Sequence, residues 1–523
     1  MKDTPTFYDD IEAYCGRLSY VVGDRLALHV SSRHAHFDIK IQREGFKNQI
    51  VWEKAGVDSS YFEAPPDADA NGCRWPANME IDIQEDWQSG FYLITLTAHG
   101  AKAGHNIAHA GFVVRGTSRS TKPLLVLATN TWNAYNNWGG CSLYTGGNTV
   151  SFRRPFGRGM LKRPQVDRDD RKARPTRPGE EPDIDGNLFQ AYRLAKGYPA
   201  AIGSSGWFSY ERRFVVWAES IGYELDYAIS SDLEEFPELL NSRSLVLSVG
   251  HDEYWSAAQR QAIENYVENG GGFASFSGNT MFWQVRLESP DSVDDHDTRS
   301  SMVCYKYAAH EHDPVLIDGR IELMSGMWAD PLVGRPEAKL LGGGSAYGLY
   351  YRFGKALARG SGAFTVYRED HWLFADTDLR YGDMLGAQDG IVGYETLGCR
   401  IQFDEFQLPI RAGGDNSPEE MEIVAFVPSS NLAVGEYPAS ISALNDQGDL
   451  EFIASRLYGD LSAESIARVR YGNAVMLTCW PYGHDKGEVV TIGTTDWAFG
   501  LANDAAVGQV TSNVFKHFGF SPG

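Results

Sequence analysis

The sequence predicts an α/β fold in which an N-terminal β-sandwich precedes a Rossmann-like, doubly wound α/β domain with β-rich insertions. Three observations predict it. The chain of 523 residues is long enough for about three structural units of roughly 150 residues each. Hydrophobic residues make up 43% of it and charged residues 22%, which is typical of a globular protein with a large core. The period of the apolar residues changes near residue 115.

The β-sandwich is predicted to cover residues 1–118. Apolar and polar residues alternate there in short runs separated by turn residues, for example Leu26 to Val30 (LALHV), Phe37 to Ile41 (FDIKI) and Gly90 to Thr97 (GFYLITLT). A period of two is typical of strands with one buried face.

The α/β domain is predicted to cover residues 119–523. Short apolar runs alternate with helical patterns, which indicates parallel strands joined by crossover helices. The runs are Leu124 to Ala128 (LLVLA), Tyr223 to Ile229 (YELDYAI), Leu245 to Val249 (LVLSV) and Phe273 to Phe276 (FASF).

Two helices of this domain have marked ends. Ser256 with Gln259 three residues later predicts a capping box, and Gly270 predicts the stop of the same helix. A second helix is predicted from about Glu211 to Ile221, closed by Gly222.

The remainder of the domain is predicted to be decorated with β structure around residues 340–470. Gly-rich turns alternate there with strand-like runs such as Glu422 to Val427, and Val475 to Thr478 follows. A strand at Glu488 to Ile492 and a helix from Ala505 to Phe518 are expected at the end.

Composition limits the partners and the compartment. The net charge of −22 repels nucleic acid and anionic lipid, and no run approaches the ~18 apolar residues of a membrane helix. The six cysteines never form C-x-x-C, and the first ten residues (MKDTPTFYDD) lack the apolar run of a secretory signal. We therefore expect a cytoplasmic protein that binds neither nucleic acid nor membranes.

Residues 151–177 form a basic segment in this acidic chain, with ten Lys or Arg against three Asp, and the segment contains three prolines. The segment is interpreted either as a solvated loop or as a contact for an acidic partner surface or a neighbouring subunit.

Familiar hydrolase motifs are missing. Gly140 to Tyr144 (GCSLY) fails the G-x-S-x-G pattern at its last position, and no P-loop is present. Gly250-His251-Asp252 stands where amidotransferase-like folds place a cysteine after a central strand. A covalent serine or cysteine mechanism is disfavoured.

The loop Gly250 to Trp255 (GHDEYW) leaves the predicted strand Leu245 to Val249 at its carboxyl end, where open α/β sheets bind ligands. Four consecutive polar or ionisable side chains there indicate a functional site. The alternative is that His251 and Asp252 only cap and brace the loop.

A second polar loop, residues 130–140 (NTWNAYNNWGG), follows the strand Leu124 to Ala128 in the same topological position. Its rings and carboxamides suit a small neutral polar ligand, which makes Asn130, Trp132 and Tyr135 candidate binding residues. The alternative is a loop packed by its own aromatic residues.

Two groups of His and acidic residues, 294–297 (DDHD) and 310–313 (HEHD), could be taken for metal ligands. Neither has the H-E-x-x-H spacing, so a solvated surface is expected at both.

Several longer segments resemble one family. They are 129–136 (TNTWNAYN), 139–144 (GGCSLY), 250–256 (GHDEYWS), 277–286 (SGNTMFWQVR), 302–307 (MVCYKY), 334–337 (GRPE) and 493–497 (GTTDW). In this order they resemble the large (beta) subunit of N,N-dimethylformamidase, over about residues 120–523, with a weaker likeness in the N-terminal β domain. The resemblance implies a Rossmann-like domain of the glutamine-amidotransferase-like type.

The resemblance also implies an amidohydrolase that cleaves the C–N bond of a small linear N-alkyl amide with one iron ion held by two tyrosines and a glutamate. Carried onto this chain, the ligands are Tyr254, Tyr210 and Glu337. Arg335 stands where the family has a histidine, two residues before the glutamate. Phenolate and carboxylate are hard donors that suit a ferric ion, and three such anions neutralise its charge.

In such an enzyme a carboxylate must move a proton to the departing amine, because an amide anion is a very poor leaving group. Glu395 is the first candidate, Glu253 and Asp496 follow, and His251 completes the expected catalytic set. The expected substrate contacts are Asn130, Trp132, Tyr135, Asn279, Phe282 and Trp283.

The resemblance further implies a homodimer or higher homo-oligomer, with a small accessory subunit as a possible partner. The rival interpretation is a non-catalytic protein that binds a carbohydrate or another small ligand in an aromatic-lined crevice. Iron content and a tyrosinate-to-iron absorption band discriminate the two.

Overall fold

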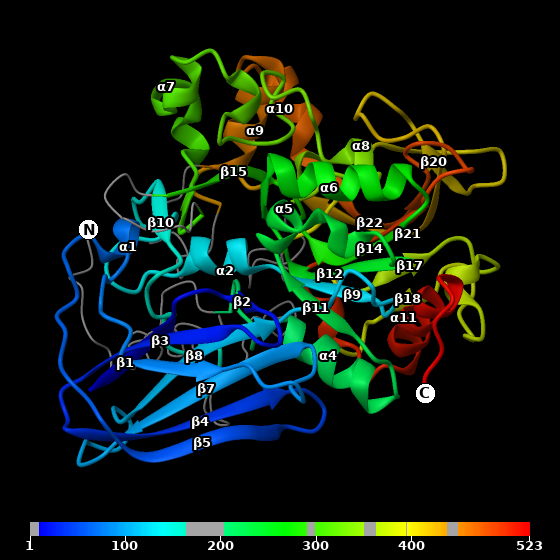
Figure 1. Ribbon diagram of the computed structural model, residues 1–523. Coiled ribbons are helices and arrows are strands. Elements are labelled where there is room, and N and C mark those ends of the chain that lie inside the picture. The colour runs from blue at the N-terminus through cyan, green and yellow to red at the C-terminus, as the bar shows by residue number, and fades with distance from the viewer. Residues whose placement is uncertain (1–9, 164–202, 290–298, 350–361, 394, 437–447) are drawn as a thin grey trace, which may run out of the picture.

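The computed structural model describes residues 10–163, 203–289, 299–349, 362–393, 395–436 and 448–523. Within these ranges the protein is a mixed α/β structure with several sheets and ten α-helices (Figure 1). The N-terminal sheets lie below the large central sheet in this view, and α7, α9 and α10 lie above it.

The first part of the chain forms a five-stranded sheet of order β2-β8-β7-β4-β5 and a three-stranded sheet of order β1-β3-β6. One hydrophobic core joins them, and Leu28, Phe37, Ile94 and Phe112 are buried in it. The predicted strands of this region are confirmed. The bounds are β1 (Ile11–Cys15), β2 (Ser19–Tyr20), β3 (Arg25–Ser32), β4 (His36–Glu44), β5 (Gln49–Asp58), β6 (Met79–Asp82), β7 (Gly90–Ala98) and β8 (Ile107–Val114).

The central sheet has nine strands in the order β11-β9-β12-β14-β23-β22-β21-β17-β18. Its first five strands run parallel and its last four pair antiparallel. The β structure expected as decoration therefore extends this sheet. The bounds are β9 (Leu124–Leu127), β11 (Asp226–Ile229), β12 (Leu245–His251), β14 (Gly272–Gly278), β17 (Phe364–Val366), β18 (Met384–Leu385), β21 (Met421–Ser430), β22 (Tyr471–Cys479) and β23 (Val489–Ile492).

Strand β11 begins later than predicted. Tyr223 lies before the strand, and its ring stacks on Phe515 with the ring centroids 4.1 Å apart.

Helices cover both faces of the parallel strands. Alternate side chains of β9 enter different cores: Leu125 and Leu127 share one core with α4 (Glu211–Ser220) and α11 (Ala505–His517), whereas Leu124 shares the other with α6 (Ala257–Glu268). Figure 1 shows α4 and α11 on one side of these strands and α6 on the other. The three predicted helices, α4, α6 and α11, are confirmed. Both faces of the sheet are covered because successive side chains of a strand point to opposite faces, and each apolar face must be buried.

Only one of the two hydrogen bonds of the predicted capping box forms at the start of α6. The Ser256 hydroxyl accepts a hydrogen bond from the Gln259 backbone N–H at 3.1 Å, as in a capping box. The Gln259 side chain turns elsewhere, and its Oε1 accepts from Asn130 Nδ2 at 3.3 Å.

The segment predicted as a polar loop after β9 contains a buried helix, α2 (Thr129–Tyr135). Its polar side chains are tolerated in a buried helix because other segments of the chain supply hydrogen bonds to them. Asn133 Nδ2 donates to the Val150 carbonyl at 3.2 Å, and Asn130 donates a hydrogen bond to Gln259. The other helices are α1 (Ala68–Asn71), α5 (Asp232–Glu235), α7 (Ala309–His312), α8 (Ala338–Leu341), α9 (Asp449–Tyr458) and α10 (Ala463–Arg470).

Two smaller sheets complete the described structure. One has the order β10-β16-β15-β13 and the other is the pair β19-β20. Their bounds are β10 (Thr149–Ser151), β13 (Tyr254–Ser256), β15 (Trp283–Glu288), β16 (Ser301–Val303), β19 (Ile401–Phe403) and β20 (Pro409–Arg411).

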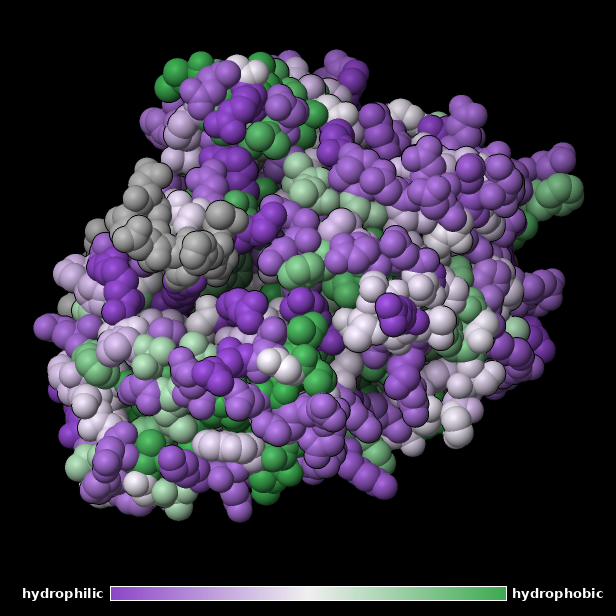
Figure 2. Space-filling model, viewed as in Figure 1, coloured by the Kyte–Doolittle hydropathy of each residue, from purple (hydrophilic) through white to green (hydrophobic). Residues whose placement is uncertain are grey.

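Hydrophilic residues cover most of the face seen in Figure 2. None of the helices in the described ranges combines the length and apolarity needed to cross a membrane.

The described part of the basic segment, residues 151–163, is not a solvated loop throughout: Arg154 and Arg163 are buried. Arg154 donates to the carbonyls of Trp138 and Asn136 at 2.7 and 2.8 Å. Residues 164–177 lie outside the described residues.

Candidate functional site

Three polar segments meet at the carboxyl edge of the parallel strands. Strand β9 leads into α2, β12 ends at His251, and β14 ends at Gly278 just before Asn279. These strands are adjacent and parallel, so their ends meet at the same edge. The sequence prediction of a ligand-binding edge there rests on the same topology.

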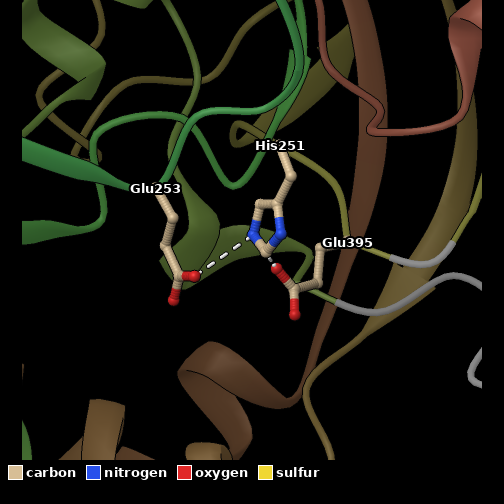
Figure 3. Close-up of side chains that lie close together, drawn as sticks. All are labelled: His251, Glu253 and Glu395. Atoms are coloured by element: carbon tan, nitrogen blue, oxygen red, sulfur yellow. Dashed lines mark ion pairs between the residues drawn. The ribbon is translucent and has the colours of Figure 1, made fainter. Parts of the chain in front are cut away.

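A buried cluster of His251, Glu253 and Glu395, called here the His251 cluster, lies at this edge. The Nε2 atom of His251 is 2.6 Å from Glu395 Oε2 and 3.3 Å from Glu253 Oε2. Figure 3 shows the imidazole between the two carboxylates. The three side chains come from three separate positions: His251 ends β12, Glu253 lies in the turn after it, and Glu395 lies between β18 (Met384–Leu385) and β19 (Ile401–Phe403). They are thus brought together by the fold.

The backbone fixes the state of the imidazole. His251 Nδ1 is 2.8 Å from the Ser204 carbonyl, which can only accept, so Nδ1 carries a hydrogen. Burial lowers the pKa of His251, but Glu395 and Glu253 outweigh it and raise the pKa to about 9. The two carboxylates thus favour the protonated imidazole, in which Nε2 also carries a hydrogen.

The Glu253 carboxylate accepts hydrogen bonds from three aromatic side chains. The Tyr144 hydroxyl lies 2.8 and 2.9 Å from its two oxygens, the Tyr135 hydroxyl 3.1 Å from Oε2, and Trp283 Nε1 2.8 Å from Oε1. Burial raises the pKa of Glu253, and the charge of His251 acts against that rise. Three donors and one cation thus compensate a carboxylate that is only 3% exposed.

Glu395 is linked by hydrogen bonds to Glu337. Asn279 Nδ2 donates to Glu395 Oε2 at 2.9 Å, Ser345 Oγ donates to Asn279 Oδ1 at 2.5 Å, and the Ser345 N–H donates to Glu337 Oε1 at 3.1 Å. Burial raises the pKa of Glu337 to about 7. The Asn279 side chain uses both ends of its amide, which fixes its orientation.

The expected metal ligands lie around this network. Tyr254 follows Glu253 in β13, its hydroxyl is buried without a hydrogen-bond partner among the described residues, and the neighbouring Tyr144 hydroxyl donates to Glu253 instead. Glu337 Oε2 is likewise buried and unpaired within the described ranges. Tyr210 precedes α4 and packs so closely on Gly250 that a Cβ added there would lie 2.2 Å from Tyr210 Cβ.

Phenol and carboxylate oxygens are donors that a hard cation prefers, but the contacts described for these three residues are with different neighbours: Tyr210 with Gly250, Tyr254 with Tyr144, and Glu337 with Ser345. A buried phenol or carboxylate oxygen without a partner costs roughly 1–3 kcal/mol, a cost that a bound cation would remove. The atoms of the His251 cluster lie within 4.8 Å of one another and could also be considered as ligands. The His251–Glu395 distance of 2.6 Å is, however, that of a direct ion-pair contact, whereas two ligands of one ion are about 3 Å apart or more.

The other predicted contact residues support the site from behind. Asn130 Nδ2 donates to the Tyr254 carbonyl at 3.2 Å, and Phe282 packs edge-on against Trp283 with centroids 4.6 Å apart. Trp132 turns to the α4 side, where its Nε1 donates to Glu211 Oε1 at 2.9 Å.

Sequence reasoning missed Tyr144, Lys306 and Ser345 as residues of this site. The Lys306 ammonium lies 3.3 Å from the centroid of the Tyr144 ring, and burial lowers its pKa while Glu253 acts against that shift. Tyr144 and Lys306 stand in two of the segments that carry the family resemblance, and that was the available signal.

The two acidic-histidine groups have different outcomes. His310 Nε2 pairs with Asp330 Oδ2 at 2.6 Å and is partly exposed, but Asp313 is buried and paired with Arg286 at 2.8 Å, so the expected solvated surface is wrong for Asp313. Residues 294–297 lie outside the described residues.

Comparison with known proteins gives consistent matches. The family model described as "N,N-dimethylformamidase beta subunit-like, C-terminal" matches residues 38–509. The N,N-dimethylformamidase beta subunit of an Alcaligenes species is 24% identical over 253 residues, which cover 45% of this chain and 32% of that protein. The protein of the same name from Paracoccus aminophilus is 24% identical over 257 residues, with the same two coverages. The matched region thus spans about a third of the length of these relatives.

Proposed function

Because the chain belongs to the N,N-dimethylformamidase beta subunit-like family, we propose that it is an amidohydrolase that cleaves the C–N bond of a small linear N-alkyl amide. The observation that carries this proposal is the buried His251 cluster, an imidazole held between two carboxylates at the carboxyl edge of the parallel strands, where α/β sheets bind ligands.

The proposal includes one ferric ion held by Tyr210, Tyr254 and Glu337. It is supported by the unpaired buried oxygens of Tyr254 and Glu337, which are hard donors. When bound, such an ion supplies Lewis acidity towards a carbonyl oxygen and towards water.

The residues of the chain would handle the proton. In amide hydrolysis the water oxygen bonds to the carbonyl carbon, the C–N bond breaks, and the nitrogen leaves as an amine after gaining a proton. His251 Nε2 and Glu395 Oε2 lie 2.6 Å apart, so this pair would supply the proton for that transfer. Glu253, held by three donors, keeps the imidazole in place.

Substrate contacts are proposed for the side chains around this edge. The rings of Phe282 and Trp283 would contact the alkyl groups of an amide, since methyl groups offer no hydrogen bonds. Trp132 was expected to do the same, but its ring turns to Glu211 on the α4 side, so we leave it out of the proposed contacts. Asn130, Tyr135 and Asn279 would contact its polar atoms.

At the level of the whole protein, we propose a cytoplasmic homodimer or higher homo-oligomer, with a small accessory subunit as a further partner. Support comes from the relatives, which are named as a subunit. We also propose that the N-terminal sheets form a β-sandwich domain (1–118) and that the parallel strands form a Rossmann-like domain (119–523), which is supported by their shared core and by the helices on both faces.

The test is amine release from a panel of short N-alkyl amides by purified protein, together with its iron content and tyrosinate absorption band. Glu395→Gln and His251→Gln should lower kcat by about a hundredfold or more. His310→Gln is the matched control, because His310 makes an equally short contact with a carboxylate outside the cluster, at 2.6 Å. Equal activity of H251Q and H310Q would overturn the assignment of the cluster.

The metal assignment is tested separately. Tyr254→Phe removes the proposed phenolate donor and should abolish both the bound iron and the absorption band. Retention of about one iron per chain in this variant would remove Tyr254 from the proposed site.

A further inference from the structure

A cavity of about 340 Å³ lies where the N-terminal sheets meet the segment that follows β10. One wall is the face of the five-stranded sheet that carries Thr95 of β7 and His109 of β8, and the other consists of residues from the stretch 156–163. Thr95 and His109 are register partners in the antiparallel pair, so both side chains lie on this face. None of the described residues that line the cavity belongs to the His251 cluster. The cavity is therefore separate from the proposed active site.

The same face of β7 is tightly covered farther along the strand. Phe91 and Leu93 alternate with Thr95 on this face and lie in the large core, where the Phe91 ring stacks on Trp207 with the centroids 4.4 Å apart. Protein interiors are close-packed, and voids larger than a water molecule are few. The opening at Thr95 and His109 thus departs from the packing around it. Its volume and its place between two parts of the fold are typical of small-molecule sites.

The charged part of the cavity is predominantly cationic. The charged side chains of its lining are Glu12, Arg158, Lys162 and Arg163. Within the described ranges the exposed Lys162 ammonium forms no hydrogen bond or ion pair. The buried Arg163 guanidinium is fixed, because it donates to Ser209 Oγ at 2.9 Å and to the Gly159 carbonyl at 3.1 Å. In a chain of net charge −22, an excess of cations around one cavity favours an anionic ligand there.

His109 presents an imidazole to the same cavity. The side chain is half-buried, and no described residue forms a hydrogen bond with either ring nitrogen. Burial lowers the pKa of His109 to about 4, and the nearby charges of Lys162 and Arg158 add to that fall. The ring is thus neutral at pH 7, with one nitrogen that donates and one that accepts. Because the Lys162 charge acts on the imidazole, the two groups border the same part of the cavity.

We propose that this cavity binds a small monocarboxylate with an apolar body. The carboxylate would accept hydrogen bonds from Lys162 and His109, whose side chains lack a hydrogen-bond partner within the described ranges. The apolar body would contact Ile107, Phe156 and Leu161, which also line the cavity. A water molecule occupies about 30 Å³, so the volume suits a ligand of on the order of ten non-hydrogen atoms. The inference does not rest on the proposed amide hydrolysis.

Benzoate is the probe, and its affinity for the full chain is measured by isothermal titration calorimetry. Benzoate should bind at least about tenfold more tightly than neutral benzyl alcohol or cationic benzylamine, because hydrogen bonds to a charged acceptor are the stronger ones. Benzylamine that binds as tightly as benzoate would overturn the proposal. Absence of saturable benzoate binding at millimolar concentrations would do the same.

Three substitutions test the place of the ligand. His109→Phe keeps a ring without its nitrogens and should weaken benzoate at least about tenfold, whereas Lys162→Met should weaken it about fivefold, because exposed charge pairs contribute less. Ile107→Trp, at a 42% exposed position, should narrow the cavity and weaken benzoate and benzyl alcohol alike. The control is Lys516→Met on α11, whose ammonium lies 3.6 Å from Asp376 and which should keep wild-type affinity. Wild-type benzoate affinity in H109F or in K162M would overturn the proposal.

Benzoate could instead bind at the His251 cluster, because amide hydrolysis releases a carboxylic acid. Glu395→Gln decides this, since Glu395 does not line the cavity. Benzoate affinity within about twofold of the wild type in E395Q supports the cavity, whereas a larger loss in E395Q than in H109F places the ligand at the cluster and overturns the proposal. If the wild-type protein releases no amine from any amide, the proposed function fails, and the calorimetry still decides whether the cavity binds a carboxylate.

Discussion

Asp232 should make the protein less stable at neutral than at acidic pH. Its carboxylate is 2% exposed, and its Oδ2 accepts from Ser19 Oγ at 2.8 Å and from the Ile229 N–H at 2.9 Å. Burial raises its pKa from 3.8 to about 6 against the opposing effects of Arg115 and these two donors, while Glu235 adds to the rise.

The sign follows from the direction of the shift. The folded state binds this proton more tightly than the unfolded state, so no stability is lost below about pH 4, where both states are protonated. Between about pH 4 and pH 6 the unfolded state ionises first, and stability falls. A rise of the pKa from 3.8 to about 6 corresponds to about 3 kcal/mol, which is fully lost by pH 7.

Asp232→Asn removes the titration and keeps an oxygen that can accept both hydrogen bonds. The difference in unfolding free energy between the variant and the wild type should therefore grow in favour of the variant by about 3 kcal/mol from pH 4 to pH 7. Urea unfolding at several pH values measures this difference, and any constant cost of the amide cancels. A difference that does not change with pH would refute the reasoning.

Three further substitutions have defined outcomes. Arg154→Met should lower the unfolding free energy by at least about 3 kcal/mol in urea titrations, because it leaves the buried carbonyls of the α2 turn unpaired; a loss below about 1 kcal/mol would mean that water replaces the guanidinium. Leu247→Ala, at a fully buried position of β12, should cost about 2–5 kcal/mol by the same measurement, and a smaller loss would indicate that the core collapses around the site. Gly250→Ala places a side chain at a φ of +81° and against Tyr210. It should destabilise the fold by more than about 1 kcal/mol and lower the iron content found by metal analysis. An unchanged iron content would argue against Tyr210 as a ligand.

Much of the secondary structure could be predicted because its signals are local. The Ser256 cap and Gly270 placed α6 correctly, since both act within one turn of the helix ends. The helix α2 could not be predicted, because its asparagines are poor helix formers and are held by partners from distant segments, such as Val150 and Gln259.

The burial of charged residues could not be predicted from local sequence either. Asp313 was expected on a solvated surface from its acidic neighbours, but it is buried against Arg286 and the Ser325 hydroxyl at 2.8 and 2.7 Å. The composition of a short segment does not reveal a partner that arrives from another part of the chain.

The sequence by itself determined the family, the alternation of strands and helices, and the position of His251 and Glu253 just beyond a central strand. These follow from apolar periodicity, turn residues and motif order, all of which are readable along the chain. Only the tertiary structure decided that Glu395 meets both His251 and Asn279 and that Lys306 lies over Tyr144. The physical reason is that a buried charge is tolerated only where distant segments supply its compensation, and that supply is a property of the packed molecule.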